Sequence, residues 1–154
     1  TALKLNEKIG NTKNRSRLEF TFTMFIQHWK KHARYDLDIY RDAYKHGLEV
    51  GDLIFCSHSI KLIGETRIML GDNIDELREE YNKFRDFQMG SKAPFNEHNF
   101  IETLQMCLCL KDLTGKTGRL NSVDFDEDEH MLYYRKENNL LGIFYLSLIM
   151  LRVR

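Results

Sequence analysis

Apolar residues recur every three or four positions over most of this chain, which is the spacing of one face of an α-helix. Short groups of Gly, Asp, Asn and Pro interrupt this spacing, and such groups end one helix and begin the next. They lie at residues 51–52, 71–73, 90–94 and 114–121. The pattern predicts an all-α fold of about seven helices, arranged as a superhelical array of antiparallel helix pairs.

The predicted helices have bounds set by these interruptions. They cover residues 17–34, 37–50, 53–70, 73–88 and 96–110, then a sixth helix opened by the acidic stretch 124–129, and a seventh over 140–151. Asn138 and Asn139 separate the last two helices. Only residues 120–125 have a pattern that could equally be extended.

Three kinds of residue support these bounds. Gly51 suits the left-handed conformation that ends many helices. Asn73 and Glu76 have the spacing of a capping box, which begins a helix. Asn96, two residues after the only proline of the chain, is predicted to be the N-cap of the fifth helix.

Two of the predicted helices have distinctive apolar faces. The helix over 53–70 is apolar nearly all round, so we expect it to be covered on most sides. In the helix over 17–34, Phe20, Met24 and either Gln27 or His28 have helical spacing, and four further residues are expected to widen the apolar stripe: Phe22, Phe25, Ile26 and Trp29.

The domain organisation follows from length and composition. The chain has 154 residues, of which 42% are hydrophobic, so it can bury a true core without disulfides. We expect a polar lead-in over 1–16 and a single helical-repeat domain over 17–154. The chain begins at Thr1 rather than Met, and its last predicted helix ends without a cap, so we expect a fragment of a longer protein.

The overall charge is balanced, with 23 basic and 23 acidic residues. Such a chain has no global field to attract nucleic acid or an anionic membrane. The charge is unevenly distributed, because residues 1–45 hold ten basic and five acidic residues whereas 46–154 hold 13 and 18. This asymmetry permits end-to-end or partner contacts, although most such imbalances are solvated faces.

The three cysteines lie inside apolar helical stretches, where cysteine behaves as a small hydrophobe. Cys107 and Cys109 lack the spacing of a redox pair, so core packing is expected for both. An odd number of cysteines favours a reducing compartment, and a cytoplasmic location is therefore predicted. The longest apolar run, 140–151, is too short to span a membrane.

Several short motifs imitate known sites. Residues 114–118 (TGKTG) resemble a phosphate-binding loop, but Leu110 occupies the place of its first glycine and the loop follows a predicted helix. The acidic stretch 124–129 lacks the glycine of a calcium loop and is better explained as a helix N-terminus. The sequence therefore predicts no cofactor and no catalytic residue.

Two further hypotheses concern histidine residues. His28 and His32 have a helical spacing that can hold one metal ion, but Lys30 and Lys31 between them oppose a cation, so no metal site is assigned. His58, within an apolar helix, is read as a hydrogen-bonded core histidine, with a pH-sensitive or ligand-contacting role as the alternative.

A resemblance to known helical repeats adds to this reading. The tetratricopeptide repeat (TPR) pattern has large and small residues on a first helix, a Gly-Asp turn, and a small residue early in a second helix. A degenerate form of this pattern is found here at Tyr40, Ala43, Tyr44, Gly51-Asp52, Cys56 and Ile60. Longer stretches, HWKKHA (28–33), YKHGLEVGDLIFCSHS (44–59) and LGDNIDELREEYNKF (70–84), resemble the helical region of large multidomain signalling proteins. In those proteins the helical region follows a signal-transduction ATPase module, which itself often follows a serine/threonine kinase-like domain. An output domain such as a histidine kinase, cyclase or phosphatase comes after the helical region.

The resemblance implies a non-catalytic arm that mediates protein–protein or interdomain contacts. Its partners would be neighbouring domains of the parent protein or a signalling partner. The candidate contact residues combine aromatic and basic side chains: Trp29, Lys30, Lys31, Arg34, Tyr40 and Tyr44. The alternative is a ligand-sensing domain with a pocket around His58, Glu65 or Arg67. A homodimer through the last helix is also possible in this reading, at Phe144, Leu148 and Leu151.

Overall fold

The computed structural model describes residues 2–90 and 94–154, with side chains at 4–6, 8–84 and 100–154. The chain forms two compact units, Thr1–Asn96 and Glu97–Arg154. A compact unit is not by itself a domain, so the single helical-repeat domain expected over 17–154 stays a prediction.

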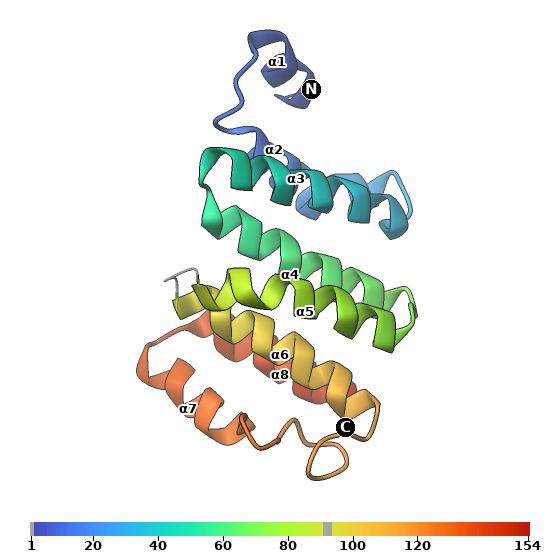
Figure 1. The fold of residues 1–154 in the computed structure, drawn as a ribbon, viewed down its shortest axis with the longest axis vertical. Helices are drawn as coiled ribbons and strands as arrows, with labels where there is room; N and C mark the ends of the chain where they lie inside the picture. The colour runs from blue at the N-terminus through green and yellow to red at the C-terminus, as the bar shows by residue number, and fades with distance from the viewer. Residues whose placement is uncertain (1, 91–93) are drawn as a thin grey trace. The chain divides into compact units, whose positions relative to one another are not determined.

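The fold is all-α, as the sequence predicts (Figure 1). The described residues form eight α-helices: α1 (Ala2–Ile9), α2 (Arg15–Phe25), α3 (Asp36–Val50), α4 (Leu53–Met69), α5 (Ile74–Gly90), α6 (Pro94–Leu110), α7 (Glu127–Lys136) and α8 (Leu140–Val153). Two 3-10 turns, η1 (Gln27–Trp29) and η2 (Ala33–Tyr35), connect α2 to α3. Helix α1 was not predicted, because it lies in the polar lead-in. Within the described ranges, the only extended pairing is an isolated bridge between Ser122 and Phe125.

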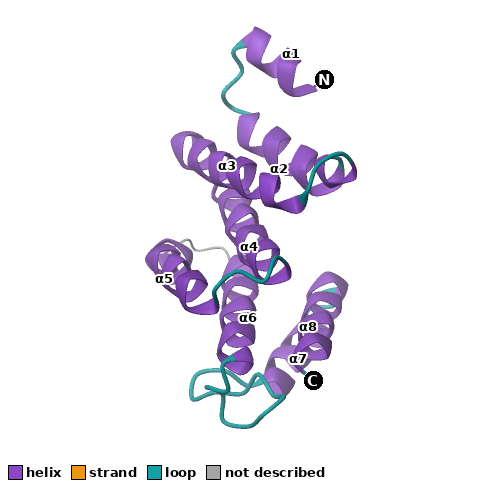
Figure 2. Cartoon of the chain, turned by 90° about the vertical axis from the view of Figure 1, so that its right-hand side faces the viewer, coloured by secondary structure: helices purple, strands orange, loops and turns teal. Residues whose placement is uncertain are grey.

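In the first unit, helix α3 packs against both α2 and α4, and α4 packs against α5. Figures 1 and 2 show these helices lying one after another through the unit. One core cluster, shared by α2, α3 and α4, contains Phe20, Leu37, Tyr40, Ala43 and Ile63. Helix α4 has ten buried residues on several sides, including Ile60, Ile63 and Arg67, so the prediction that it is covered on most sides is confirmed.

The turn between α3 and α4 is two residues long. Gly51 has φ +73°, the left-handed conformation predicted for it. The amide of Asp52 donates to the Gly47 carbonyl at 2.8 Å, which closes the end of α3. Because so short a turn reverses the chain, α3 and α4 form an antiparallel pair.

Two predicted helix starts have different outcomes. The side chain of Asn73 accepts hydrogen bonds from the amides of Asp75 and Glu76, so this cap is confirmed. The N-cap prediction for Asn96 is wrong, because α6 already begins at Pro94, and proline is well suited to the first turn of a helix. The Asn96 side chain lies outside the described residues.

The first predicted helix is too long. Helix α2 ends at Phe25 instead of continuing to residue 34, and the chain then passes through η1 and η2. Phe25, Ile26 and Trp29 are consequently exposed, so they do not widen the apolar stripe as expected. The physical reason is a buried hydrogen bond between Gln27 and Asp36, which requires the chain between them to reverse direction.

In the second unit, α7 packs against α8 and is also joined to α6. The Tyr134 ring lies against Gly142, where an added Cβ would come within 2.5 Å of the ring. The Tyr134 hydroxyl donates to Glu102 of α6 at 2.6 Å. Asn139 accepts from the amide of Gly142, so the predicted division between α7 and α8 is confirmed.

The cysteines and the apolar helices agree with the sequence reading. Cys56, Cys107 and Cys109 are not joined in disulfides, and all three are buried. Among the described residues, no helix has both the length and the apolar character that crossing a membrane requires.

Gly64 of α4 allows the close approach of α5. A Cβ at this position would overlap the ring and hydroxyl of Tyr81, which is 1% exposed and donates to the Ile60 carbonyl. We expect Gly64→Ala to lower the free energy of unfolding by about 1–3 kcal/mol, because a buried ring must move. Urea denaturation would measure this loss.

The matched control is Gly115→Ala, where the nearest atom to an added Cβ is 3.7 Å away and the contact is ordinary. We expect its stability to stay within about 0.5 kcal/mol of the parent chain. Equal effects of the two substitutions would contradict the close packing of α5 on α4.

Candidate functional site

The six predicted contact residues separate into two groups. Trp29, Lys30, Lys31 and Arg34 come together in the connection between α2 and α3 and are all exposed. Two tyrosines lie elsewhere. Tyr40 is 4% exposed within the core, and the half-buried Tyr44 packs edge-on against Phe84 of α5 at 5.1 Å between ring centroids. Neither tyrosine ring lies with the other four residues.

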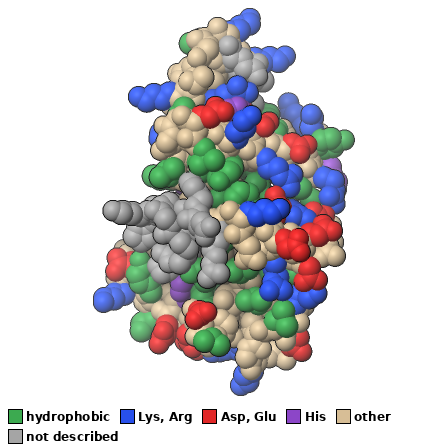
Figure 3. Space-filling view, in the orientation of Figure 1, with side chains coloured by type: hydrophobic (Ala, Val, Ile, Leu, Met, Phe, Trp, Pro, Cys, Tyr) green, Lys and Arg blue, Asp and Glu red, His purple; other side chains and the backbone are tan. Residues whose placement is uncertain are grey.

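We call residues 25–35 the aromatic-basic corner. Four large apolar side chains are exposed within it: Phe25 (59%), Ile26 (48%), Trp29 (81%) and Tyr35 (60%). Figure 3 shows hydrophobic, histidine and basic side chains gathered at this end of α2 and α3, on the right-hand edge of the view. Contiguous exposed apolar side chains of this kind mark interaction sites more often than isolated ones do.

A buried hydrogen bond holds the base of the corner. Gln27 and Asp36 are 6% and 5% exposed, and the Gln27 amide donates to Asp36 Oδ1 at 2.9 Å. The same amide lies 3.3 Å from the Tyr35 carbonyl. Gln27 and Asp36 are nine positions apart in the sequence, at the two ends of the connection between α2 and α3. Their hydrogen bond therefore restrains the conformation of the turns between them.

Further contacts stiffen the exposed part of the corner. His32 Nδ1 accepts from the amide of Arg34 at 3.2 Å and so caps η2. The Lys31 ammonium lies 5.6 Å from the centroid of the Tyr35 ring, within cation–π range. The His28 and Trp29 rings are 5.2 Å apart. The exposed aromatic rings are thus held against neighbours rather than extended into solvent alone.

The charge of the corner is positive. Arg34 pairs with Asp72 at 3.1 Å, and Asp72 is shared with Arg67 of α4. In the part of the chain that the structure describes, neither Lys30 nor Lys31 forms an ion pair. These two ammonium groups can therefore meet carboxylates of another molecule without breaking an internal pair.

Burial affects the one carboxyl group at the base. Desolvation raises the pKa of Asp36 above its usual value, although the hydrogen bond from Gln27 and the nearby His28 and His32 act against this shift. Without the Gln27 donor, the ionised carboxylate would be buried with less compensation.

His28 and His32 do not adopt the geometry on which a metal site would depend. The helical spacing of the two imidazoles is absent, because His28 lies in η1 and His32 has the extended dihedrals φ −61° and ψ 140°. Among the described residues, no group of three or more potential ligands could hold a metal ion.

The three residues named for the alternative pocket, His58, Glu65 and Arg67, all lie on α4. The His58 ring packs between Phe20 and Phe55, at 5.7 and 5.8 Å between centroids. Lys61 pairs with Glu65 at 3.8 Å. Arg67 binds Asp72 and Glu80 at the far end of α4. The ligand-sensing alternative stays a prediction.

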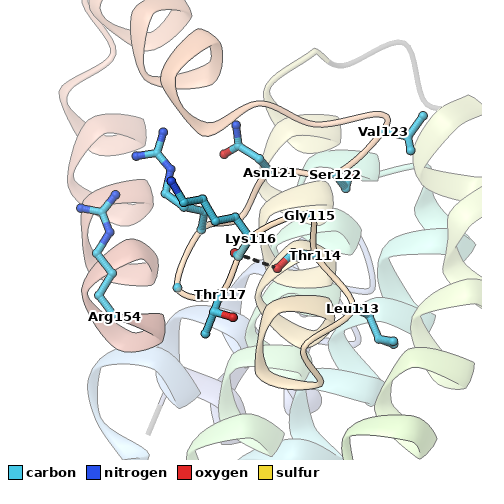
Figure 4. Close-up of a pocket in the computed structure, with 11 residues that line it drawn as sticks. Leu113, Thr114, Gly115, Lys116, Thr117, Asn121, Ser122, Val123 and Arg154 are labelled. Atoms are coloured by element: carbon cyan, nitrogen blue, oxygen red, sulfur yellow. Dashed lines mark hydrogen bonds between the residues drawn. The ribbon is translucent and has the colours of Figure 1, made fainter.

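The loop that imitates a phosphate site lies between α6 and α7, where it borders an open hollow of about 1270 Å³. Figure 4 shows Arg154, from the end of α8, beside the part of the loop that carries Lys116 and Thr117. Arg154 and Arg119 both bind the buried carboxylate of Glu127, at 2.8 and 2.7 Å. Arg119 also pairs with Asp128, so these two arginines face two carboxylates, and Lys116 is a further cation of the lining.

Sequence reasoning misses three exposed large apolar residues of the corner. Phe25, Ile26 and Tyr35 are not among the predicted contact residues, because the first two fit a helical stripe that is expected to be buried. The available signal is that five of the seven residues over 28–34 are basic or histidine, which is unusual on a helix that has to bury Trp29.

No family model, curated protein or solved structure matches this chain. Its class is therefore defined by the fold itself, which is an all-α arrangement of packed helices.

The Gln27–Asp36 bond gives a first test of the corner. We expect Gln27→Leu to lower the free energy of unfolding by about 1–3 kcal/mol, because a buried carboxylate loses its amide donor. In the background of Asp36→Asn, which removes the buried charge, the same substitution should cost less. Chemical denaturation of the four proteins measures the coupling, and additive effects would show that the two side chains do not interact.

His58 gives a pH-dependent test. Burial, helped by the positive charge of Lys61, lowers the pKa of His58 in the folded chain below its usual value of 6.5, against a smaller opposite effect of Asp52. Below about pH 6.5 the unfolded chain then binds a proton that the folded chain does not. The His58 contribution to stability is therefore fully present above this pH and is lost as the pH falls towards the folded pKa.

The measurement is the free energy of unfolding of the parent chain and of His58→Gln as the pH is lowered from 7.5 to 5, a range of about one unit or more on either side of the reference value. We expect the parent chain to lose more stability over this range than the variant. Parallel pH profiles would contradict a buried, neutral His58.

Proposed function

We propose that this chain is a non-catalytic helical-repeat segment that mediates protein–protein or interdomain contacts in a multidomain signal-transduction protein. The aromatic-basic corner is the contact site. Its partner is a protein segment that carries carboxylates beside a large apolar side chain, on a neighbouring domain of the parent protein or on a signalling partner. The three sequence stretches that resemble the TPR-like helical region of signalling proteins support this context.

The main observation behind the proposal is that Trp29 is exposed on a turn whose two ends are held by the Gln27–Asp36 hydrogen bond. Trp29 is 81% exposed, whereas the Gln27–Asp36 bond beneath it is buried. Tryptophan and tyrosine are enriched among the residues that dominate binding energy at protein interfaces. The Gln27–Asp36 bond restrains the turn that carries Trp29, so less backbone entropy is lost when a partner binds.

Charge indicates the chemistry of that partner. Lys30, Lys31 and Arg34 lie within five residues, and the only carboxylate between positions 25 and 36 is the buried Asp36. Because Arg34 is paired with Asp72, the two lysines are the cations of the corner that can meet a partner's carboxylates without breaking an internal pair. An acidic segment would complement this charge and would bind faster at low ionic strength.

A protein partner is favoured over nucleic acid or membrane. Three cations are few compared with the roughly 6–10 phosphate contacts of a typical DNA-binding protein. The chain has no net charge to add a long-range attraction. The apolar part of the corner instead matches a segment that has a hydrophobic side chain of its own.

Selection from a library of random peptides displayed on phage would test this proposal. We expect peptides recovered on the folded chain to be rich in Asp and Glu next to an aromatic or aliphatic residue. Synthetic copies should bind the double variant Lys30→Glu/Lys31→Glu at least about tenfold more weakly, and Trp29→Ala similarly, as measured by fluorescence anisotropy.

The matched control reverses two exposed lysines elsewhere in the same unit, Lys13→Glu/Lys45→Glu. This variant has the same net charge as the corner variant, so it should bind as the parent chain does. Equal losses in both variants would indicate a general charge effect. Peptides without acidic enrichment, or binding of single-stranded RNA or anionic vesicles in place of peptides, would make the proposal wrong.

A further inference from the structure

The outward face of α8 is apolar along its length. Leu140, Leu141, Phe144 and Leu151 are 73%, 52%, 60% and 74% exposed, and Leu148 is half-buried. The opposite face carries Gly142, Leu146 and Ile149, all of which are buried. Helix α8 therefore uses one face for the core of its unit and presents a second apolar face, which we call the outer stripe.

The outer stripe has a symmetric spacing. Four of its residues, Leu141, Phe144, Leu148 and Leu151, are separated by three, four and three positions, and Leu140 directly precedes them. Reversing the helix direction leaves this spacing unchanged. Two copies of the stripe placed antiparallel therefore match Leu141 with Leu151 and Phe144 with Leu148, around an axis near Leu146.

We propose that the outer stripe binds a second copy of this chain, with the two α8 helices antiparallel. Such a contact is isologous, because each copy uses the same surface. It does not rest on the proposed function, since it involves α8 and not the aromatic-basic corner. The residues on the stripe carry no charge, so the partner surface has to be apolar as well.

The charges at the two ends of α8 favour the antiparallel direction. Arg152 is exposed at the C-terminal end, and the exposed Glu137 lies just before the N-terminal end. In an antiparallel pair, Arg152 of one copy lies opposite Leu140 of the other, close to the turn that carries Glu137. In a parallel pair the two Arg152 side chains would meet, and like charges would repel.

The expected strength is low. A single helix pair buries less than the roughly 1,200–2,000 Å² of standard stable interfaces. A dissociation constant on the order of 10–100 μM is therefore expected. Ser147, exposed and next to the axis, is small enough to let the helices approach closely.

Sedimentation velocity of the whole chain over this concentration range tests the proposal. We expect a reversible monomer–dimer equilibrium in the parent chain. Phe144→Glu should raise the dissociation constant at least about tenfold, because a charge would face Leu148 of the other copy. The matched control is Met69→Glu on α4, which replaces a residue of similar exposure (62%) and should leave the equilibrium unchanged.

A charge exchange tests the direction of the helices and remains informative if Phe144→Glu fails to fold. Glu137→Arg or Arg152→Glu alone should weaken the dimer about two- to fivefold, and the double variant should restore it. A chain that stays monomeric at concentrations well above the expected range would overturn the proposal. A dimer that is insensitive to Phe144→Glu, or a double variant that is not restored, would overturn it as well.

Discussion

Close packing of α2, α3 and α4 is the constraint on which the first unit depends. A Cβ at Gly47 of α3 would lie 2.6 Å from the thiol of Cys56 on α4 and 3.0 Å from the hydroxyl of Ser16 on α2. The Ser16 hydroxyl donates to the Ala43 carbonyl at 2.7 Å, one turn earlier on α3. Only small side chains fit where three helices meet, and their small size sets how closely the backbones approach. Because α2 and α3 are this close, the chain between them has to reverse over residues 26–35.

The aromatic-basic corner is a consequence of that reversal. The residues that face the helices, Gln27 and Asp36, are buried and joined, whereas Trp29 and its basic neighbours face outward. An internal polar contact thus determines which apolar residues are exposed. The second unit shows a comparable division on α8, where Gly142 and Leu146 face the core and Phe144 faces outward. Both surfaces are apolar but differ in charge, so the corner suits an acidic segment and the outer stripe an uncharged helix.

Much of the fold could be predicted from residues that act locally. Gly51, Asn73 and Asn139 end or begin helices through their own backbone conformation or side-chain oxygens, so their positions alone indicate the boundaries. The end of α2 could not be predicted in this way, because residues 26–34 keep a helical spacing and the deciding contact joins Gln27 to a residue nine positions away. Tyr40 is predicted as a contact residue but is buried in the core, for a related reason. Periodicity identifies a helix face, but only the tertiary packing decides whether that face is covered or exposed.

Trp29, the only tryptophan of the chain, makes the central claim directly measurable. Quenching of its fluorescence by acrylamide would be compared with and without a saturating acidic peptide selected on the folded chain. If the corner is the contact site, Trp29 should be readily quenched in the free chain and protected in the complex. High salt, which screens the lysines, should weaken the complex and so reduce the protection. A peptide that binds the chain and leaves the quenching of Trp29 unchanged would contradict the account.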